Sequence, residues 1–196
     1  TWECFRVMND DPQHLLLEDI VEMAKNIGGN DHGFKFIQLP YNMNYDQALL
    51  GKNQLLQNKP VSILESAVTL GVGVFTSVPF MQGRLLSPGV MPEFSDLKPS
   101  LRALQFIRSS PGVLAPLVGQ KSSEHVAENL EIMNVPPMSD EDFLQLVNER
   151  ITVWSPIKKK FYTPDLVMKD YGVPAHNFLM YKVLMGDKSD NIPGVM

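Results

Sequence analysis

Cysteine is almost absent from this chain of 196 residues, in which Cys4 is the only one. A single cysteine cannot form an internal disulfide, and such sparse use is typical of proteins kept in a reducing compartment. We therefore expect a cytoplasmic protein that is held together by packing and not by covalent cross-links.

Long apolar runs are missing as well. A transmembrane helix needs roughly 20 consecutive apolar residues, and a secretory leader needs a basic segment followed by an apolar one. Neither pattern is present, so we do not expect a membrane protein. The sequence starts in a strand-like segment and stops just after a turn, which is typical of a fragment with two cut ends.

An excess of basic residues is also missing, because 17 Lys and Arg stand against 22 Asp and Glu, for a net charge of -5. This balance gives no overall attraction toward nucleic acid or an anionic membrane. The charge averages two unlike halves, so it is weak evidence against a nucleic-acid partner. The length allows one large domain or two small ones.

The first two thirds of the chain alternate between strand-like and helix-like segments. We expect strands over residues 1–7, 34–39, 72–77 and 113–118, and helices over residues 12–27, 62–70, 100–109 and 123–133. Four alternations with short joints favour parallel strands joined by right-handed crossovers. Such βα units form half of an eight-unit barrel or one side of a doubly wound sheet, and periodicity alone does not choose between them.

Three longer motifs favour the barrel. They are FIQLPYN at residues 36–42, VFTSVPFMQG at residues 74–83 and VGQKSSEHVAENL at residues 118–130. In this order they resemble the sixth, seventh and eighth strands of the aldo/keto reductases, with the loops and helix that follow. The resemblance covers about residues 1–146. It implies the C-terminal half of a (β/α)8 TIM barrel with four βα units, in a domain of residues 1–138.

The same resemblance implies a binding site for NADP. Loops at the carboxyl ends of barrel strands build such sites, and the N–H groups at a helix start favour phosphate. The positions that match the family's cofactor site are Gln38, Ser77, Phe80, Gly83, Gly119, Lys121, Ser122, His125, Glu128 and Asn129. Gln38 would face the nicotinamide carboxamide, Lys121 would favour the 2′-phosphate, and the pair Glu128 and Asn129 would meet adenine.

Two departures from the family limit this expectation. Ser77 stands where the family usually places an aromatic ring that stacks on nicotinamide. The family's catalytic Asp, Tyr, Lys and His come from its first four strands, which this chain lacks, so we assign no catalytic residue and expect no reduction of aldehydes or ketones. Judged by residue type alone, Lys121 also fits a solvated loop lysine and His125 a surface histidine.

Half a barrel would leave unpaired strands at both edges of its sheet. Such edges expose rows of backbone N–H and C=O groups that can pair with another chain. We therefore expect self-association through the open sheet edges.

Acidic motifs mark the last third of the chain. The motif SDEDFLQL contains Asp140 and Asp142, and the motif GDKSDNIPGV contains Asp187 and Asp190. Two acids three residues apart on a tight turn can approach one divalent cation, and Mg²⁺ prefers oxygen ligands. The first pair also fits acids in the first turn of a helix over residues 139–147. The sequence between the motifs predicts a hairpin with a basic tip, then helices starting near Pro164 and Pro174.

Together with WSPIKKK between them, these motifs resemble the phage-type 5′-nucleases, which include flap endonucleases and 5′–3′ exonucleases. The resemblance implies a small α+β fragment of residues 139–196 that acts on DNA and ends before the helix-hairpin-helix. The Mg²⁺ ligands that it implies are Asp140, Asp142, Asp187 and Asp190. Pro136 and Pro137 oppose the strand that should lead into this fragment, so we expect an incomplete metal site with slow or absent cleavage.

The sequence therefore predicts two unrelated fragments that join near residue 138. Three functions remain open. The first is a reductase remnant that binds NADP, the second is a Mg²⁺-dependent 5′–3′ exonuclease fragment acting on DNA or RNA–DNA, and the third is an inactive chimeric chain.

Overall fold

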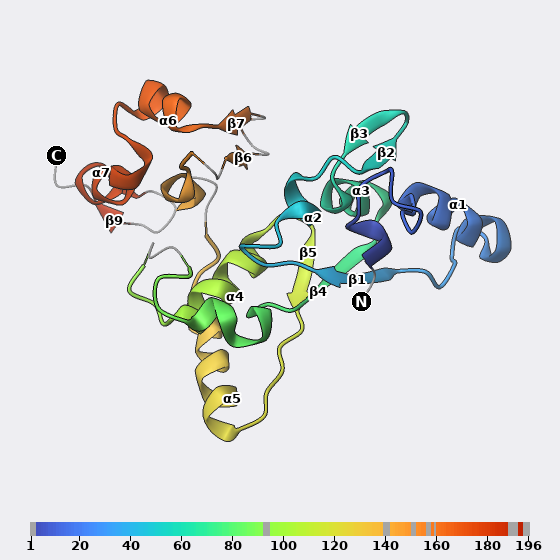
Figure 1. Ribbon diagram of the computed structural model, residues 1–196, viewed down its shortest axis with the longest axis horizontal. Helices are drawn as coiled ribbons and strands as arrows, with labels where there is room; N and C mark the ends of the chain where they lie inside the picture. The colour runs from blue at the N-terminus through green and yellow to red at the C-terminus, as the bar shows by residue number, and fades with distance from the viewer. Residues whose placement is uncertain are drawn as a thin grey trace. The chain divides into compact units, whose positions relative to one another are not determined.

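The computed structural model describes residues 3–91, 95–138, 142–149, 152–155, 158, 160–187 and 192–193. The chain divides into two compact units. Unit 1 comprises Thr1–Met91 and Leu97–Pro137, and unit 2 comprises Pro92–Asp96 and Met138–Met196. Unit 1 is an α/β structure around a parallel sheet, whereas the described part of unit 2 consists of short helices and two small hairpins (Figure 1).

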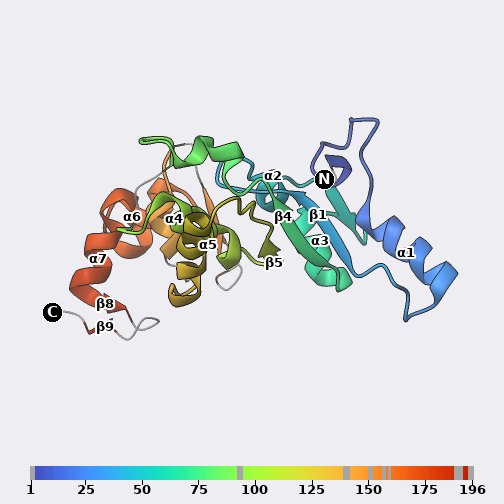
Figure 2. The same ribbon diagram turned by 90° about the horizontal axis from the view of Figure 1, so that it is seen from below.

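The sheet of unit 1 contains three strands in the order β1-β4-β5. They are β1 (Phe36–Pro40), β4 (Gly73–Ser77) and β5 (Val113–Pro116). Both neighbouring pairs are parallel. The crossovers contain helices α3 (Ile63–Leu70) and α4 (Pro99–Ser109), so the predicted α/β class with parallel strands is confirmed (Figure 2).

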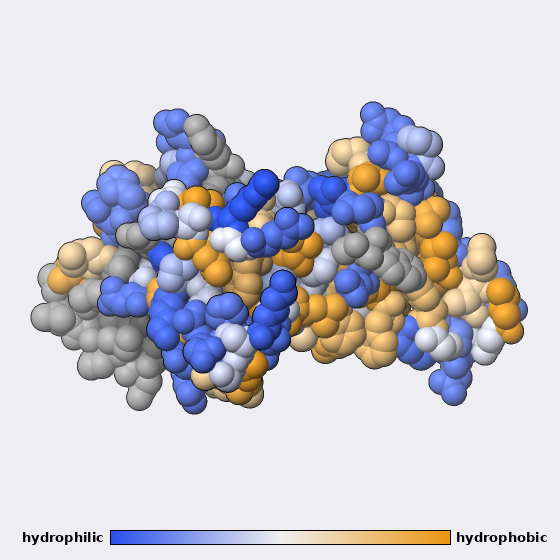
Figure 3. Space-filling model, turned by 60° about the horizontal axis from the view of Figure 1, so that its bottom comes forward, coloured by the Kyte–Doolittle hydropathy of each residue, from blue (hydrophilic) through white to orange (hydrophobic). Residues whose placement is uncertain are grey.

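One face of this sheet is packed and the other is open. Ile37, Leu39 and Val74 are at most 2% exposed, and α3 packs on β4 while α4 packs on β5. On the opposite face a Cβ at Gly73 would lie 2.8 Å from the Phe36 ring and 3.4 Å from the Leu114 side chain. Phe36 and Leu114 are more than half exposed. Figure 3 shows an apolar area on one side of unit 1.

Local signals start and stop the helices of unit 1. Ser62 caps α3 in a capping box with Glu65, and Gly71 ends it with φ of +70°. Proline occupies the first turn of α4, where its missing N–H costs nothing. The remaining elements of unit 1 are η1 (Glu3–Phe5), α1 (Leu17–Gly28), α2 (Gln47–Leu50), β2 (Gln54–Leu56), β3 (Lys59–Val61), η2 (Met81–Leu86), α5 (Ser123–Leu130) and η3 (Glu131–Asn134).

The strand expected over residues 1–7 was wrong in its described part, where Glu3–Phe5 forms a 3-10 turn. The amides of Arg6 and Val7 both donate to the Glu3 carbonyl. The side chain of Asn53 donates to the carbonyls of Phe5 and Val7, each at 2.8 Å. The side chain of Asn53, which is distant in sequence, therefore binds the carbonyl groups that a strand would have paired with its neighbour in a sheet.

The first helix also starts later than residue 12. Gln54 accepts the Leu17 amide at 2.8 Å and donates to the Leu15 carbonyl at 3.1 Å. These bonds hold the chain extended up to α1 and come from the hairpin of β2 and β3, which the sequence pattern did not predict. Consequently three parallel strands, and not four, are observed in the described residues of unit 1, and the half barrel itself remains a proposal.

Unit 2 has its own small core. Its described elements are η4 (Asp142–Leu146), β6 (Val153–Ser155), β7 (Lys160–Tyr162), α6 (Pro164–Tyr171), η5 (Ala175–Asn177), α7 (Phe178–Met185), β8 (Gly186–Asp187) and β9 (Ile192–Pro193). The buried cluster consists of Leu144, Val147, Tyr162, Val167, Ala175 and Phe178. The antiparallel pairing of β6 with β7 and the helix after it match the prediction, because Thr163 caps α6 and Gly172 ends it.

The helix expected over residues 139–147 is a 3-10 helix over Asp142–Leu146 in the described residues. Ser139 and Asp140, at the start of the expected helix, lie outside the described residues. The 3-10 form suits a short segment whose Leu144 must enter the core of unit 2, because long runs of this helix are rare.

Candidate functional site

Unit 1 contains a cavity of about 700 Å³ at the carboxyl ends of β4 and β5. Its lining residues are Val78, Pro79, Phe80, Gln82, Gly83, Leu86, Ser100, Leu117, Gly119, Lys121, His125, Glu128 and Asn129. In parallel α/β structures the loops after the strands form the binding sites, so the position is the usual one. The volume lies within the range typical of small-molecule sites.

Seven of the ten positions predicted to meet the cofactor line this cavity. They are Phe80, Gly83, Gly119, Lys121, His125, Glu128 and Asn129. The other three lie outside its lining. Gln38 is half-buried in β1 opposite Phe75, Ser77 ends β4, and Ser122 caps α5 by accepting the His125 amide at 3.3 Å.

The loop after β4 forms one wall of the cavity in an unusual conformation. Val78 has φ of +59°, Met81 of +48°, Gln82 of +57° and Gly83 of +91°. Positive φ is rare outside glycine, and for a β-branched residue such as Val78 it is a true outlier. Successive backbone N–H groups in turns of this kind make concave sites that attract anions.

Another wall is formed by the start of α4 and by α5. The Ser100 hydroxyl donates to the Glu128 carboxylate, and this hydrogen bond, with the Lys98 ammonium 3.5 Å away, holds the pKa of Glu128 below its ordinary value. The bond joins two helices that are far apart in sequence. The pocket therefore presents the Glu128 carboxylate together with the side chains of Lys121 and His125.

Asn129 is a polar residue of the cavity lining that is only 7% exposed. An amide side chain has both a donor and an acceptor, so Asn129 can exchange hydrogen bonds with a ligand in the cavity.

Six lining residues were not predicted from the sequence, and two of them, Ser100 and Gln82, are polar. Ser100 stands in the first turn of α4 behind Pro99, and it meets the cavity only because α4 packs beside α5. Gln82 belongs to the motif at residues 74–83, but its positive φ depends on the turn around it. A hydroxyl next to a helix-opening proline was the available signal for Ser100.

The predicted metal ligands lie largely beyond the described part of the chain. Asp140 and Asp190 are outside the described residues. The backbones of Asp142 and Asp187 lie in η4 and β8, respectively. Among the side chains that the structure describes, no three acids, histidines or cysteines are close enough to hold a metal ion. The four-aspartate site therefore stays a prediction.

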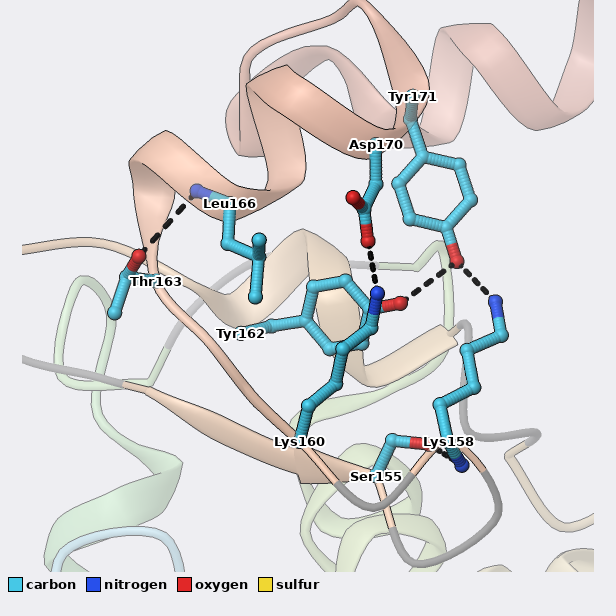
Figure 4. A network of polar contacts seen from close by, with 8 residues as sticks. All are labelled: Ser155, Lys158, Lys160, Tyr162, Thr163, Leu166, Asp170 and Tyr171. Carbon is cyan, nitrogen blue, oxygen red and sulfur yellow. Dashed lines mark hydrogen bonds and ion pairs between the residues drawn. The ribbon is translucent and has the colours of Figure 1, made fainter.

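Unit 2 carries a basic and aromatic surface near the hairpin of β6 and β7 (Figure 4). The Lys158 ammonium donates to the Tyr171 hydroxyl at 2.5 Å and lies 5.0 Å from the centre of that ring. The Lys160 ammonium is paired with the Asp170 carboxylate and lies 4.8 Å from the centre of the Tyr162 ring. The Lys160 hydrogen bond lowers the pKa of Asp170, and the same bond raises the pKa of Lys160.

The fold and cavity thus define an α/β chain with a small-molecule pocket, followed by a second unit with a basic hairpin. No protein-family model matches the chain. A 5′–3′ exonuclease of Aquifex aeolicus is 41% identical over 56 residues, which cover 29% of this chain and 19% of that protein. The thermostable DNA polymerase I of Thermus filiformis is 32% identical over 119 residues, covering 59% of this chain and 14% of the polymerase.

The DNA polymerase I of Bacillus caldotenax is 30% identical over 158 residues, covering 73% of this chain and 17% of the polymerase. Because residues 139–196 are less than a third of the chain, this longer match also includes residues before 139. The chain spans about a fifth or less of these relatives. The predicted likeness to 5′-nucleases is confirmed by relatives of this kind.

A solved aldo-keto reductase from Bacillus halodurans is 17% identical and covers 63% of this chain and 51% of its own, with a TM-score of 0.41. A likeness at this level carries no argument about function. No helix within the described ranges has the length and apolar character needed to cross a membrane.

Proposed function

We propose that unit 1 binds NADP in the cavity at the carboxyl ends of β4 and β5, as a remnant of an aldo/keto reductase. One observation carries this proposal. Seven positions chosen from sequence motifs line one cavity, although the motifs lie on separate elements. Unrelated surface residues would not share a cavity in this way.

Each wall offers chemistry suited to one part of the cofactor. The loop from Val78 to Gly83 would follow the pyrophosphate with its backbone amides. Lys121 would hold the 2′-phosphate, and Glu128 and Asn129 would meet the adenine. Bound nicotinamide supplies hydride chemistry, and we assign no residue of this chain to the accompanying proton transfer.

Lys121→Ala is the test of this proposal. We expect affinity for NADP to fall about tenfold, because a charge-assisted contact to phosphate is lost, and affinity for NAD to change less than about twofold. Titration calorimetry with both cofactors measures this difference. Lys59→Ala, an exposed lysine in β3, is the matched control. Equal affinities for the two cofactors, or an unchanged Lys121→Ala variant, would contradict the assignment.

A second function is favoured by the sequence relatives of the 5′–3′ exonuclease type. We propose that unit 2 is a fragment of a Mg²⁺-dependent nuclease that contacts DNA phosphates through its basic hairpin. Lys158 and Lys160 supply the charge, and phosphate contacts of this kind depend strongly on salt. Asp140, Asp142, Asp187 and Asp190 would hold the metal with poor affinity, and cleavage of a 5′-flap substrate is slow or absent.

Asp170→Asn should strengthen DNA binding by unit 2. Asp170 pairs with Lys160, so its neutralisation leaves this ammonium available to a phosphate. We expect about one additional phosphate contact, seen as a slope of log affinity against log salt that is steeper by about 0.9. Fluorescence anisotropy with duplex DNA measures the slope. Asp165→Asn removes the same charge from the same helix as a control, and a gain that survives Lys160→Ala would refute this account.

Self-association across the sheet edges completes the proposal for unit 1. Strand β1 is at one edge of the described sheet, and its Phe36 is 55% exposed. Phe36→Lys should shift the chain toward monomer, because a lysine on an edge strand opposes further pairing. Sedimentation velocity tests this, with Met23→Lys in α1 as control. A parent chain that sediments as a monomer would contradict the predicted self-association.

A further inference from the structure

The cavity wall after β4 begins with a strained residue. Val78 directly follows the strand and has φ of +59°, where its branched Cβ crowds the backbone. Such a conformation persists only if the surrounding structure holds it in place. Because Met81, Gln82 and Gly83 continue the turn with positive φ, the whole wall depends on how Val78 is held.

Asn42 holds it from the loop that follows the neighbouring strand β1. This side chain is 1% exposed, and its Nδ2 donates to the Val78 carbonyl at 2.8 Å. The same carbonyl accepts the Met81 amide at 3.1 Å. Asn42 is fixed in turn, because its Oδ1 accepts the amides of Asn44 at 2.9 Å and Tyr45 at 3.0 Å. The Asn42 side chain therefore connects two turns. Its Nδ2 group binds the turn that begins at Val78, and its Oδ1 atom binds the turn that contains Asn44 and Tyr45.

We infer that Asn42 is a positioning residue for ligand binding in the cavity, although it is not part of the lining. By holding the Val78 carbonyl it keeps Phe80, Gln82 and Gly83 against the cavity. The inference rests on the proposed function for its ligand. Its structural part, the lock on the turn, is independent of any ligand.

Asn42→Asp removes the donor of this side chain and keeps its acceptor, so it tests the two hydrogen-bonding functions separately. An aspartate keeps an oxygen for the Asn44 and Tyr45 amides but has no donor for the Val78 carbonyl. We expect NADP affinity to fall about tenfold, and amide hydrogen exchange over residues 78–86 to accelerate by a similar factor. Asn44→Asp places the same charge two residues away on an exposed side chain and should match the parent in both measurements.

Val78→Gly in the Asn42→Asp background provides the rescue. Glycine adopts positive φ without the Cβ penalty, so the turn no longer needs the lock, and NADP affinity should return to within about threefold of the parent. A merely structural loss at Asn42 would not be repaired by a glycine at residue 78.

The outcomes are distinct. Parent-like affinity in Asn42→Asp, or a double variant that stays as weak as Asn42→Asp, overturns the positioning role. If the parent binds neither NADP nor NAD, the proposed function fails. In that case the hydrogen-exchange rates still test whether Asn42 holds the turn. Unchanged exchange over residues 78–86 in Asn42→Asp would show that it does not.

Discussion

We expect Gly119→Trp to lower the affinity of the chain for NADP and NAD alike by about 100-fold, which is about 2.7 kcal/mol. Gly119 lines the cavity, and a Cβ built on it meets no atom within 4 Å. A tryptophan there can therefore occupy space that the cofactor needs without displacing protein atoms, and its large side chain fills much of the cavity. We expect both cofactors to be affected because the block is steric and not electrostatic.

Gly33→Trp is the matched control for this substitution. Gly33 also offers its Cβ open space, and it lies in the exposed turn before β1 and not in the cavity lining. Calorimetry measures both affinities, and thermal unfolding shows that each variant is folded. A folded Gly119→Trp variant that binds NADP as the parent does would show that the cofactor site lies elsewhere.

Phe178→Ala should unfold unit 2 at 25 °C and leave unit 1 folded. Phe178 is 1% exposed in a core cluster of six buried residues, and the ring meets Tyr171 edge-on at 4.9 Å. Truncating a buried phenylalanine costs about 3–5 kcal/mol. A unit with so small a core has only about 3–5 kcal/mol of stability to lose. Because the partners of Phe178 in this cluster belong to unit 2, the core of unit 1 keeps its contacts.

Hydrogen exchange with peptide-level resolution checks this result, because it separates α3 and α4 of unit 1 from α6 and α7 of unit 2. Met180→Ala, on the same helix at 61% exposure, should change stability by less than about 0.5 kcal/mol. Loss of protection in both units of Phe178→Ala would contradict independent cores.

Local signals were sufficient for much of the secondary structure. Ser62 with Glu65 and Gly71, and Thr163 with Gly172, mark helix ends within a few residues of chain. Capping depends on groups only three or four positions apart, so the pattern contains the whole interaction. The same holds for the parallel α/β class, because buried strands alternate with amphipathic helices along the chain.

The candidate cofactor residues were predicted from motifs, which are a different kind of signal. Gly83 and Lys121 come from separate loops, and their types alone would also fit ordinary loop positions. Their order and spacing within longer motifs made them candidates. Whether they face one space depends on the packing of α4 and α5, to which the Ser100–Glu128 hydrogen bond contributes.

The sequence by itself determined the caps, the parallel class and most candidates for the cavity, because each rests on neighbours in the chain or on a contiguous motif. Only the tertiary structure decided that residues 3–7 turn instead of pairing as a strand, since Asn53, 46 positions away from Val7, takes their carbonyls. The same is true of Val78, whose branched side chain favours extended backbone. A hydrogen bond from Asn42, in the loop after the neighbouring strand β1, holds it at a positive φ, and no local pattern encodes that bond.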